Sequence, residues 1–239
     1  MPLIPLTFPP GMYANGTDVE ATGRWRIGNL VRWVNNSLRP VGGWRDRNAA
    51  AYTAPPRGAV AWEDNAGDRW LATGQWDALT VMSASNSVYD ITPTVFTDGD
   101  LDATVNFGYG GNFYGLGIYG TERTNAGSYS EATSWTLDTW GQYLVGCSVA
   151  DGTLVGWQLN TGTPAAPIAN APTSNLGLVV TEERFLFALG ADGDPRTVAW
   201  CDRENNTVWT PSATNEAGDI QLQTGGQIMA GIRTRGQTL

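Results

Sequence analysis

Three short segments of this sequence repeat one pattern, and that pattern favours antiparallel sheets. They are RWLATG at 69–74, QYLVGC at 142–147 and RFLFAL at 184–189, and in each an aromatic residue precedes a short apolar stretch. Another apolar run comes before each segment (59–62, 133–137 and 176–180), and a third follows after a turn (79–82, 154–157 and 197–200). The second and third segments begin 42 residues apart, which is typical of four-stranded propeller blades at about 40–50 residues. We therefore expect an all-β fold of β-propeller-like four-stranded blades.

The repeats divide the chain into a leader and a series of blades. Residues 1–57 form an extended or hairpin leader, and residues 58–239 form the blades. We expect the blades at about 58–93, 133–168 and 174–211, with a Gly/aromatic insert at 94–132 and the start of another blade at 228. Since propellers close with about 4–8 blades, the expected propeller is incomplete.

The basic residues of this chain restrict its chemistry. It has no His and no Lys, so all fourteen basic residues are Arg. A Ser-His-Asp or Cys-His site cannot form, a P-loop lacks its Lys, and zinc sites with His are excluded. The two cysteines, Cys147 and Cys201, lie in apolar runs and are expected to be free buried thiols. We expect no enzyme activity, no catalytic residues, no cofactor and no metal.

The acidic residues also indicate no site. The formal net charge of −9 disfavours a protein that wraps nucleic acid. An acidic surface would suit a channel through which DNA slides without sticking, and it would equally suit plain solubility. The Asp-x-Asp-x-Asp run at 98–102 has the spacing that opens a calcium loop, but Ala103 and Tyr109 replace the Gly and the Glu that such a loop needs. Glu182 and Glu183 are adjacent, so on a strand they point to opposite faces and cannot flank one bond. The sequence has no run of 18 apolar residues, and we expect no membrane segment.

The leader combines arginine with tryptophan. Six of the fourteen arginines fall within 24 residues, and the alternation of apolar residues favours strands with a turn at 35–37. A basic leader on an acidic chain suggests charge-complementary docking to another subunit. The alternative is that these are ordinary strand-face arginines stacked on Trp. The candidate interface residues here are Arg24, Trp25, Arg26, Arg32, Trp33, Arg39 and Trp44.

The insert is rich in glycine and aromatic residues between 105 and 120. A Gly-rich backbone costs much entropy to order, so the segment is either a long surface loop or is held by a neighbour. In the second case its aromatic side chains would anchor a subunit interface, because aromatics dominate interface hot spots. The candidates are Phe107, Tyr109, Phe113, Tyr114 and Tyr119.

The leader also carries a family resemblance. FPPGMYANGT at 8–17, EATGRW at 20–25, GNLVRW at 28–33 and LRPVGGW at 38–44 resemble the opening of propeller-bearing tail nozzle or tail hub (tail tubular) proteins of short-tailed bacteriophages. The segments 108–120 and 228–239 are also similar to parts of that group, in which the latter continues into further blades. Members of the group are typically much longer than this chain.

The resemblance implies a structural protein of the virion tail. Such proteins form a homo-oligomeric ring, usually a hexamer, below the portal and adaptor proteins. The ring lines the channel for DNA exit, and some members carry fibres or spikes. An acidic wall would repel phosphate, so genomic DNA would pass through the lumen without specific binding. A carbohydrate-binding or glycan-degrading β-propeller used in host recognition remains an alternative, and an enzyme of unknown type is a third.

Overall fold

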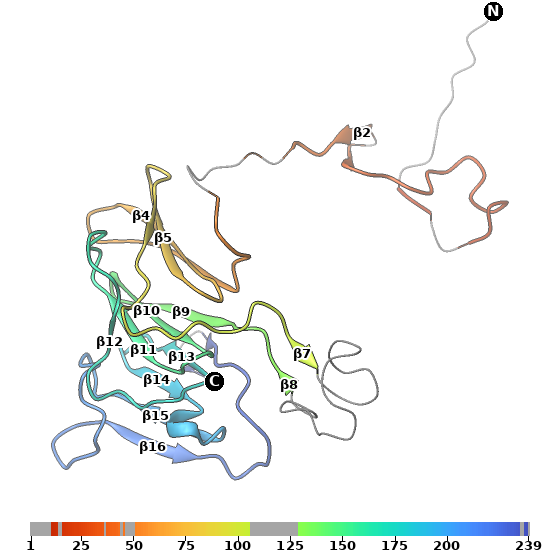
Figure 1. The fold of residues 1–239 in the computed structure, drawn as a ribbon. Coiled ribbons are helices and arrows are strands. Elements are labelled where there is room, and N and C mark those ends of the chain that lie inside the picture. Colours follow the sequence, from red (N-terminus) through yellow and green to blue (C-terminus); the bar gives the residue numbers. More distant parts are fainter. Residues whose placement is uncertain are drawn as a thin grey trace, which may run out of the picture. The chain divides into compact units, whose positions relative to one another are not determined.

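The computed structural model describes residues 11–13, 16–35, 37–43, 45, 51–105, 129–234 and 237–238. The chain divides into two compact units, Met1–Arg47 and Asn48–Leu239. Strands form nearly all of the regular structure, and the only helical element among the described residues is the 3-10 turn η1 (Ala191–Gly193). The expectation of an all-β fold is confirmed (Figure 1).

The first sheet of the larger unit is an antiparallel meander. Its strands are β3 (Gly58–Glu63), β4 (Arg69–Gly74), β5 (Leu79–Ser83) and β6 (Val88–Asp90), paired in chain order. Exposed and half-buried residues alternate along β3, as expected for a strand with one face on a core. The segment that precedes β3 is tied to this sheet, because the side-chain carbonyl of Gln75 accepts hydrogen bonds from Thr53 Oγ1 (3.0 Å) and the Ala54 amide (2.8 Å).

The second sheet has the same order, and its two central strands are buried on both faces. It consists of β9 (Trp135–Trp140), β10 (Tyr143–Ser148), β11 (Leu154–Trp157) and β12 (Ala166–Pro167). A two-residue turn joins β9 to β10, and Gly141 takes the φ of 65° that the first position of a type II′ turn requires. Along β10 and β11 neighbouring apolar residues face opposite ways, and both sets are buried.

The third sheet is again an antiparallel meander, and its last strand departs from the prediction. The sheet consists of β13 (Gly177–Val180), β14 (Leu186–Leu189), β15 (Thr197–Trp200) and β16 (Gly218–Gln221). We predicted that this unit ends at 211, whereas β16 lies in the polar stretch that follows. The strand has one apolar side chain, Ile220, which is 54% exposed, so no alternating pattern marks it. Backbone pairing with β15 defines β16 instead.

Two apolar clusters join the three sheets through the second one. Strand β9 contacts both β3 of the first sheet and β13 of the third. One cluster lies between the first and second sheets, and it includes Leu79, Val81, Leu144, Val155 and Trp157. The other lies between the second and third sheets, and it includes Val145, Cys147, Leu154, Leu178 and Leu186. The second sheet is therefore the centre of the larger unit.

Glycines allow Trp135 to lie close to the first sheet. A Cβ atom added at Gly74 would overlap the Trp135 ring, and one added at Gly58 would overlap the Trp135 backbone. The Trp135 indole reaches the turn after β4 and donates to the Gln75 carbonyl oxygen at 2.6 Å. Phe96 stacks on the same ring, with centroids 5.4 Å apart. Glycine at these two strand ends is thus required by close packing between the sheets.

Three two-stranded pairs complete the described structure. In the smaller unit, β1 (Val31–Val34) pairs with β2 (Ser37–Pro40). In the larger unit, β7 (Thr104–Val105) pairs with β8 (Tyr129–Ser130), and β17 (Arg233–Thr234) pairs with β18 (Gln237–Thr238). The β7–β8 pair falls within the predicted insert at 94–132, most of which lies outside the described residues.

Candidate interaction surfaces

The leader hairpin, β1–β2, places two of the predicted arginines directly opposite each other. Arg32 pairs with Arg39 in the antiparallel register, and both residues are exposed. Like charges at directly opposed positions are unfavourable. Neither guanidinium makes an ion pair with a described residue. An acidic partner would remove this repulsion.

The other two predicted arginines of the leader have partners within it. Arg24 lies over the Tyr13 ring, with the guanidinium carbon 5.2 Å from the ring centroid. Arg26 forms an ion pair with Asp18. Both residues therefore have partners within the leader, but these partners are Tyr13 and Asp18 and not the tryptophans of the alternative expectation.

Apolar side chains of the leader surround a small pocket of about 180 Å³. Its lining residues are Met12, Trp25, Ile27, Gly28, Asn29, Val31, Trp33 and Leu38. The predicted candidates Trp25 and Trp33 thus line the same pocket, although they are eight positions apart in the sequence. The indole Nε1 of Trp33 is buried and has no hydrogen-bond partner. Ile27 and Leu30 are 83% and 64% exposed, so much of the apolar surface of this unit faces water.

The two units carry opposite charge. Residues 1–47 contain six arginines and three acidic residues, whereas residues 48–239 contain eight arginines and twenty acidic residues. The formal charges are therefore +3 and −12, which together give the −9 of the whole chain. A chain with one basic, apolar unit and one strongly acidic unit fits electrostatic docking between copies.

Several predicted interface residues fall outside the described residues. They are Trp44, Phe107, Tyr109, Phe113, Tyr114 and Tyr119. The prediction that the Gly/aromatic segment forms an interface therefore stays a prediction. Sequence reasoning also overlooked Met12, Ile27 and Leu38 of the leader pocket. The alternation of Trp25 with Ile27 is the signal that could have placed Ile27 beside the tryptophans.

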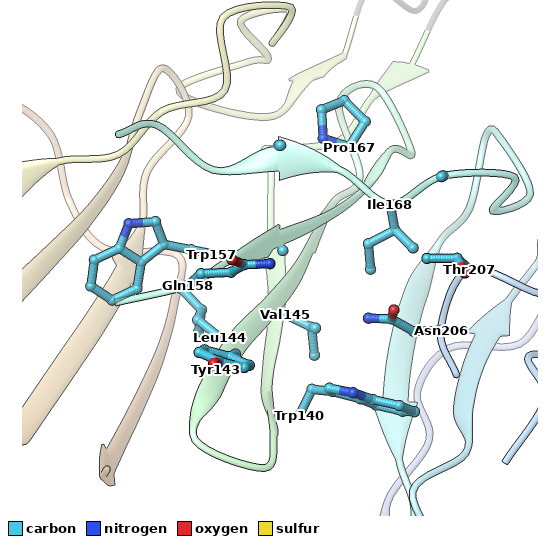
Figure 2. A pocket seen from close by; sticks show the side chains of 13 residues that line it. Trp140, Tyr143, Leu144, Val145, Trp157, Gln158, Pro167, Ile168, Asn206 and Thr207 are labelled. Atoms are coloured by element: carbon cyan, nitrogen blue, oxygen red, sulfur yellow. The ribbon is translucent and has the colours of Figure 1, made fainter. Parts of the chain in front are cut away.

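A groove of about 280 Å³ opens on the second sheet, and its lining includes residues from a loop of the third-sheet region (Figure 2). It is lined by Trp140, Tyr143, Leu144, Val145, Gly156, Trp157, Gln158, Ala166, Pro167, Ile168, Ala169, Asn206 and Thr207. In the view of Figure 2, Trp140 and Tyr143 lie on one side and Pro167 and Ile168 on the opposite side, with Gln158 and Asn206 at the flanks. We refer to this feature as the aromatic groove. It was not predicted, because its residues come from strands and loops far apart in the sequence.

The face of the third sheet that points away from the second sheet carries aromatic residues. Phe187 stacks on Trp200 with ring centroids 5.7 Å apart, and both are half-buried. The segment after β16 reaches this sheet, since the Ile228 amide donates to the Pro195 carbonyl oxygen at 2.8 Å. A Cβ atom added at Gly231 would meet Leu189 and Val179 at 3.1 and 3.2 Å. Residues 228–231, where we predicted the start of another blade, thus lie against β13 and β14.

Two carboxylates of the Asp-x-Asp-x-Asp run at 98–102 have protein partners, and so does Glu63 at the end of β3. Asp100 accepts a hydrogen bond from the Ser130 hydroxyl, and Asp102 lies 3.4 Å from the Arg57 guanidinium. Glu63 pairs with Arg69 at 3.4 Å. Among the residues that the structure describes, no three His, Cys, Asp or Glu side chains group as metal ligands would.

Both cysteines are buried free thiols. Burial, with a smaller effect of Asp151, raises the pKa of the Cys147 thiol to about 12. Burial also raises the pKa of the Cys201 thiol to about 11. Since the thiolate is the reactive form, neither cysteine has the properties of a nucleophile in the folded chain.

No helix in the described part of the chain is long and apolar enough to cross a membrane. Comparison of the chain with protein-family models, curated proteins and solved structures finds no match.

Proposed function

We propose that this chain is a structural subunit of the virion tail of a short-tailed bacteriophage. Copies would assemble side by side into a ring, a nozzle or hub, which extends the DNA-exit channel below the portal and adaptor proteins. By the resemblance of the leader, the ring is a hexamer to which tail fibres or spikes attach. The proposal gives the chain no catalytic role.

The opposite charges of the two units carry the proposal. The leader has a formal charge of +3 and the larger unit −12. In a ring, the leader of one copy would dock on the acidic unit of the next copy. Such an arrangement places the opposed Arg32 and Arg39 side chains beside carboxylates, where their mutual repulsion is offset.

The apolar surface of the leader supports the same arrangement. Large exposed apolar patches on a soluble protein mark interaction sites. Ile27 and Leu30 are exposed beside a pocket that contains two tryptophans. Tryptophan and arginine are the residues most enriched in interface hot spots. The leader therefore has the composition of an interface anchor.

The order of the sheets supports a propeller-like body. Each four-stranded sheet is a meander, and the first strands of consecutive sheets are in contact, β3 with β9 and β9 with β13. In a propeller the first strands of neighbouring blades lie closest to the axis. A body of this kind is a rigid platform. The acidic charge of this body suits a channel wall that repels DNA phosphates.

The test is the oligomeric state of the full chain as a function of salt. Sedimentation at about 10 µM should show a ring-sized species in about 0.05 M NaCl that dissociates in about 0.5 M NaCl, because salt screens exposed charges. Negative-stain images should show rings. The double variant Arg32→Glu/Arg39→Glu should shift the population to monomer.

The matched control changes two arginines on the larger unit. Arg69 and Arg203 are exposed and pair with Glu63 and Glu216. The double variant Arg69→Glu/Arg203→Glu alters the net charge equally and should retain the ring. A monomer at both salt concentrations, or equal loss of assembly in both double variants, would contradict the proposed docking. In virions that contain this chain, an antibody against it should label the tail and not the capsid.

A further inference from the structure

We propose that the aromatic groove is a binding site for one neutral saccharide ring. The site lies on the larger unit and uses none of the leader residues on which the tail role depends. Its occupation by a sugar would add recognition of a neutral glycan to a structural protein.

On the aromatic side of the groove, Tyr143 offers its ring to the ligand, whereas Trp140 is only 7% exposed and borders the groove from the core. Tyr143 is 36% exposed and follows Trp140 across the β9–β10 turn. The guanidinium of Arg184 lies over the Trp140 ring at 5.4 Å and does not line the groove. This contact helps to hold the Trp140 indole in place. Aromatic faces carry partial negative charge, so they attract the weakly positive C–H groups on the apolar face of a sugar.

The flanks of the groove offer neutral hydrogen-bonding groups. The side-chain amides of Gln158 and Asn206 make no hydrogen bond to a described residue, so their donors and acceptors are available to a ligand. None of the lining residues is charged. An amide both donates and accepts, as a sugar hydroxyl does, whereas an ionic ligand would find no counter-charge here. The chemistry of the lining therefore favours a neutral polyhydroxylated ligand.

The loop that carries the polar groups is fixed before any ligand binds. The Trp209 indole donates to the Asn206 carbonyl oxygen at 2.7 Å, and the Asn170 side chain donates to the Thr207 carbonyl oxygen at 3.0 Å. The Thr207 hydroxyl donates to Asn205 at 2.7 Å. Binding would thus cost little ordering of the backbone.

The size of the groove suits a small ligand, and the edge of the second sheet disfavours an added peptide strand. About 280 Å³ is slightly below the range of about 300–1,000 Å³ for drug-sized ligands, which suits one sugar ring. A peptide could add to the free edge of the second sheet, but that edge strand, β12, contains Pro167, which has no amide to donate. We therefore infer a saccharide ring instead of an added strand.

The test is a titration of the full chain with neutral methyl glycosides of glucose and galactose, with N-acetylglucosamine and with maltose. Saturation-transfer NMR and tryptophan fluorescence would report binding. The chain should bind at least one of these neutral probes with a Kd of about 1–10 mM, which is typical of a ligand of this size. Glucuronate and a blocked Ala-Pro-Ala peptide serve as anionic and peptide comparators, and each should bind more weakly.

The variants change groove residues that are exposed (Tyr143 and Gln158) or half-buried (Asn206), so their loss should leave the core intact. Tyr143→Ala and Asn206→Ala should each weaken binding about tenfold or more, while Tyr143→Phe should keep most of it. Gln158→Ala should weaken binding, and its matched control is Gln227→Ala, an exposed glutamine outside the groove. Circular dichroism would verify the fold of each variant.

Three results would overturn this inference. They are no binding of any neutral probe up to about 50 mM, binding that persists in Tyr143→Ala, and preference for the peptide. The oligomeric state of the same variants separates the two proposals, since changes in the groove should leave assembly unchanged.

Discussion

The indole of Trp135 in the second sheet donates to the Gln75 carbonyl oxygen in the first sheet at 2.6 Å. The two residues are 60 positions apart in the sequence. The bond is buried, and it satisfies a turn carbonyl that water does not reach. A buried acceptor that loses its partner costs about 1–3 kcal/mol. This contact is therefore one of the main polar links between the two sheets.

Trp135→Phe should lower the free energy of unfolding by about 1–3 kcal/mol, because phenylalanine cannot donate to Gln75. Urea unfolding followed by circular dichroism would measure the change. The matched control is Trp200→Phe, since the Trp200 indole makes an exposed bond to the Glu216 carbonyl oxygen at 2.8 Å. Equal losses in the two variants would show that the buried bond has no special role.

Gly74→Ala should destabilise the larger unit through overpacking. The new methyl group would overlap the Trp135 ring, so either the ring or β4 must shift. Overpacking of this kind typically costs about 1–3 kcal/mol. Gly225→Ala is the control, because nothing lies within 4 Å of its added Cβ atom. An unchanged thermal unfolding temperature in Gly74→Ala would contradict the close packing of Trp135 against this glycine.

The buried thiol of Cys147 should make stability depend on alkaline pH. Burial raises its pKa from 9.0 to about 12 in the folded chain. Between these values the unfolded chain releases the proton while the folded chain keeps it, so the free energy of unfolding falls as pH rises above about 9. One thiol contributes a slope of up to about 1.4 kcal/mol per pH unit. Cys147→Ala should unfold with a shallower slope between pH 9 and pH 11. An identical slope in the variant would contradict a neutral buried thiol.

Asp64 should have the opposite pH dependence. A hydrogen bond from the Trp70 indole at 3.0 Å, together with backbone amides of the β3–β4 turn, lowers the pKa of this carboxyl below 3.8. Its stabilising effect is therefore present above pH 3.8 and is lost as pH falls through the folded-state pKa. Asp64→Asn should be less stable than the original chain at neutral pH, and the difference should shrink in acid. Asp68→Asn is a control in the same turn. A difference that is constant with pH would show that the charge of Asp64 does not contribute.

The sequence predicted the sheets where apolar residues repeat and failed where backbone pairing alone defines a strand. The runs at 59–62, 69–74 and 79–82 became β3, β4 and β5 because each carries apolar side chains that are buried against the core, with alternating burial along β3. Strand β16 has no such face, so nothing in its composition distinguishes it from a loop. The same holds for the short β17–β18 pair.

The interaction surfaces could be predicted only in part. The sequence predicted a hairpin with its turn at 35–37, and the Arg32–Arg39 opposition follows from the observed register, in which Val34 pairs with Ser37 and β2 begins at Ser37. The aromatic groove could not be predicted, because Tyr143 and Asn206 come together only after the second and third sheets pack. Periodicity in the sequence describes one strand at a time and does not report which sheets become neighbours.

The position of β9 has a consequence for folding during synthesis. Since β9 touches β3 behind it in the sequence and β13 ahead of it, a nascent chain that has only the first sheet has no surface on which to complete its core. The tight β9–β10 hairpin can form locally, and it then offers both earlier and later strands a template. We expect the larger unit to fold cooperatively only after the second sheet has been synthesised. A ribosome pause before residue 135 would therefore leave a collapsed intermediate with an incomplete core.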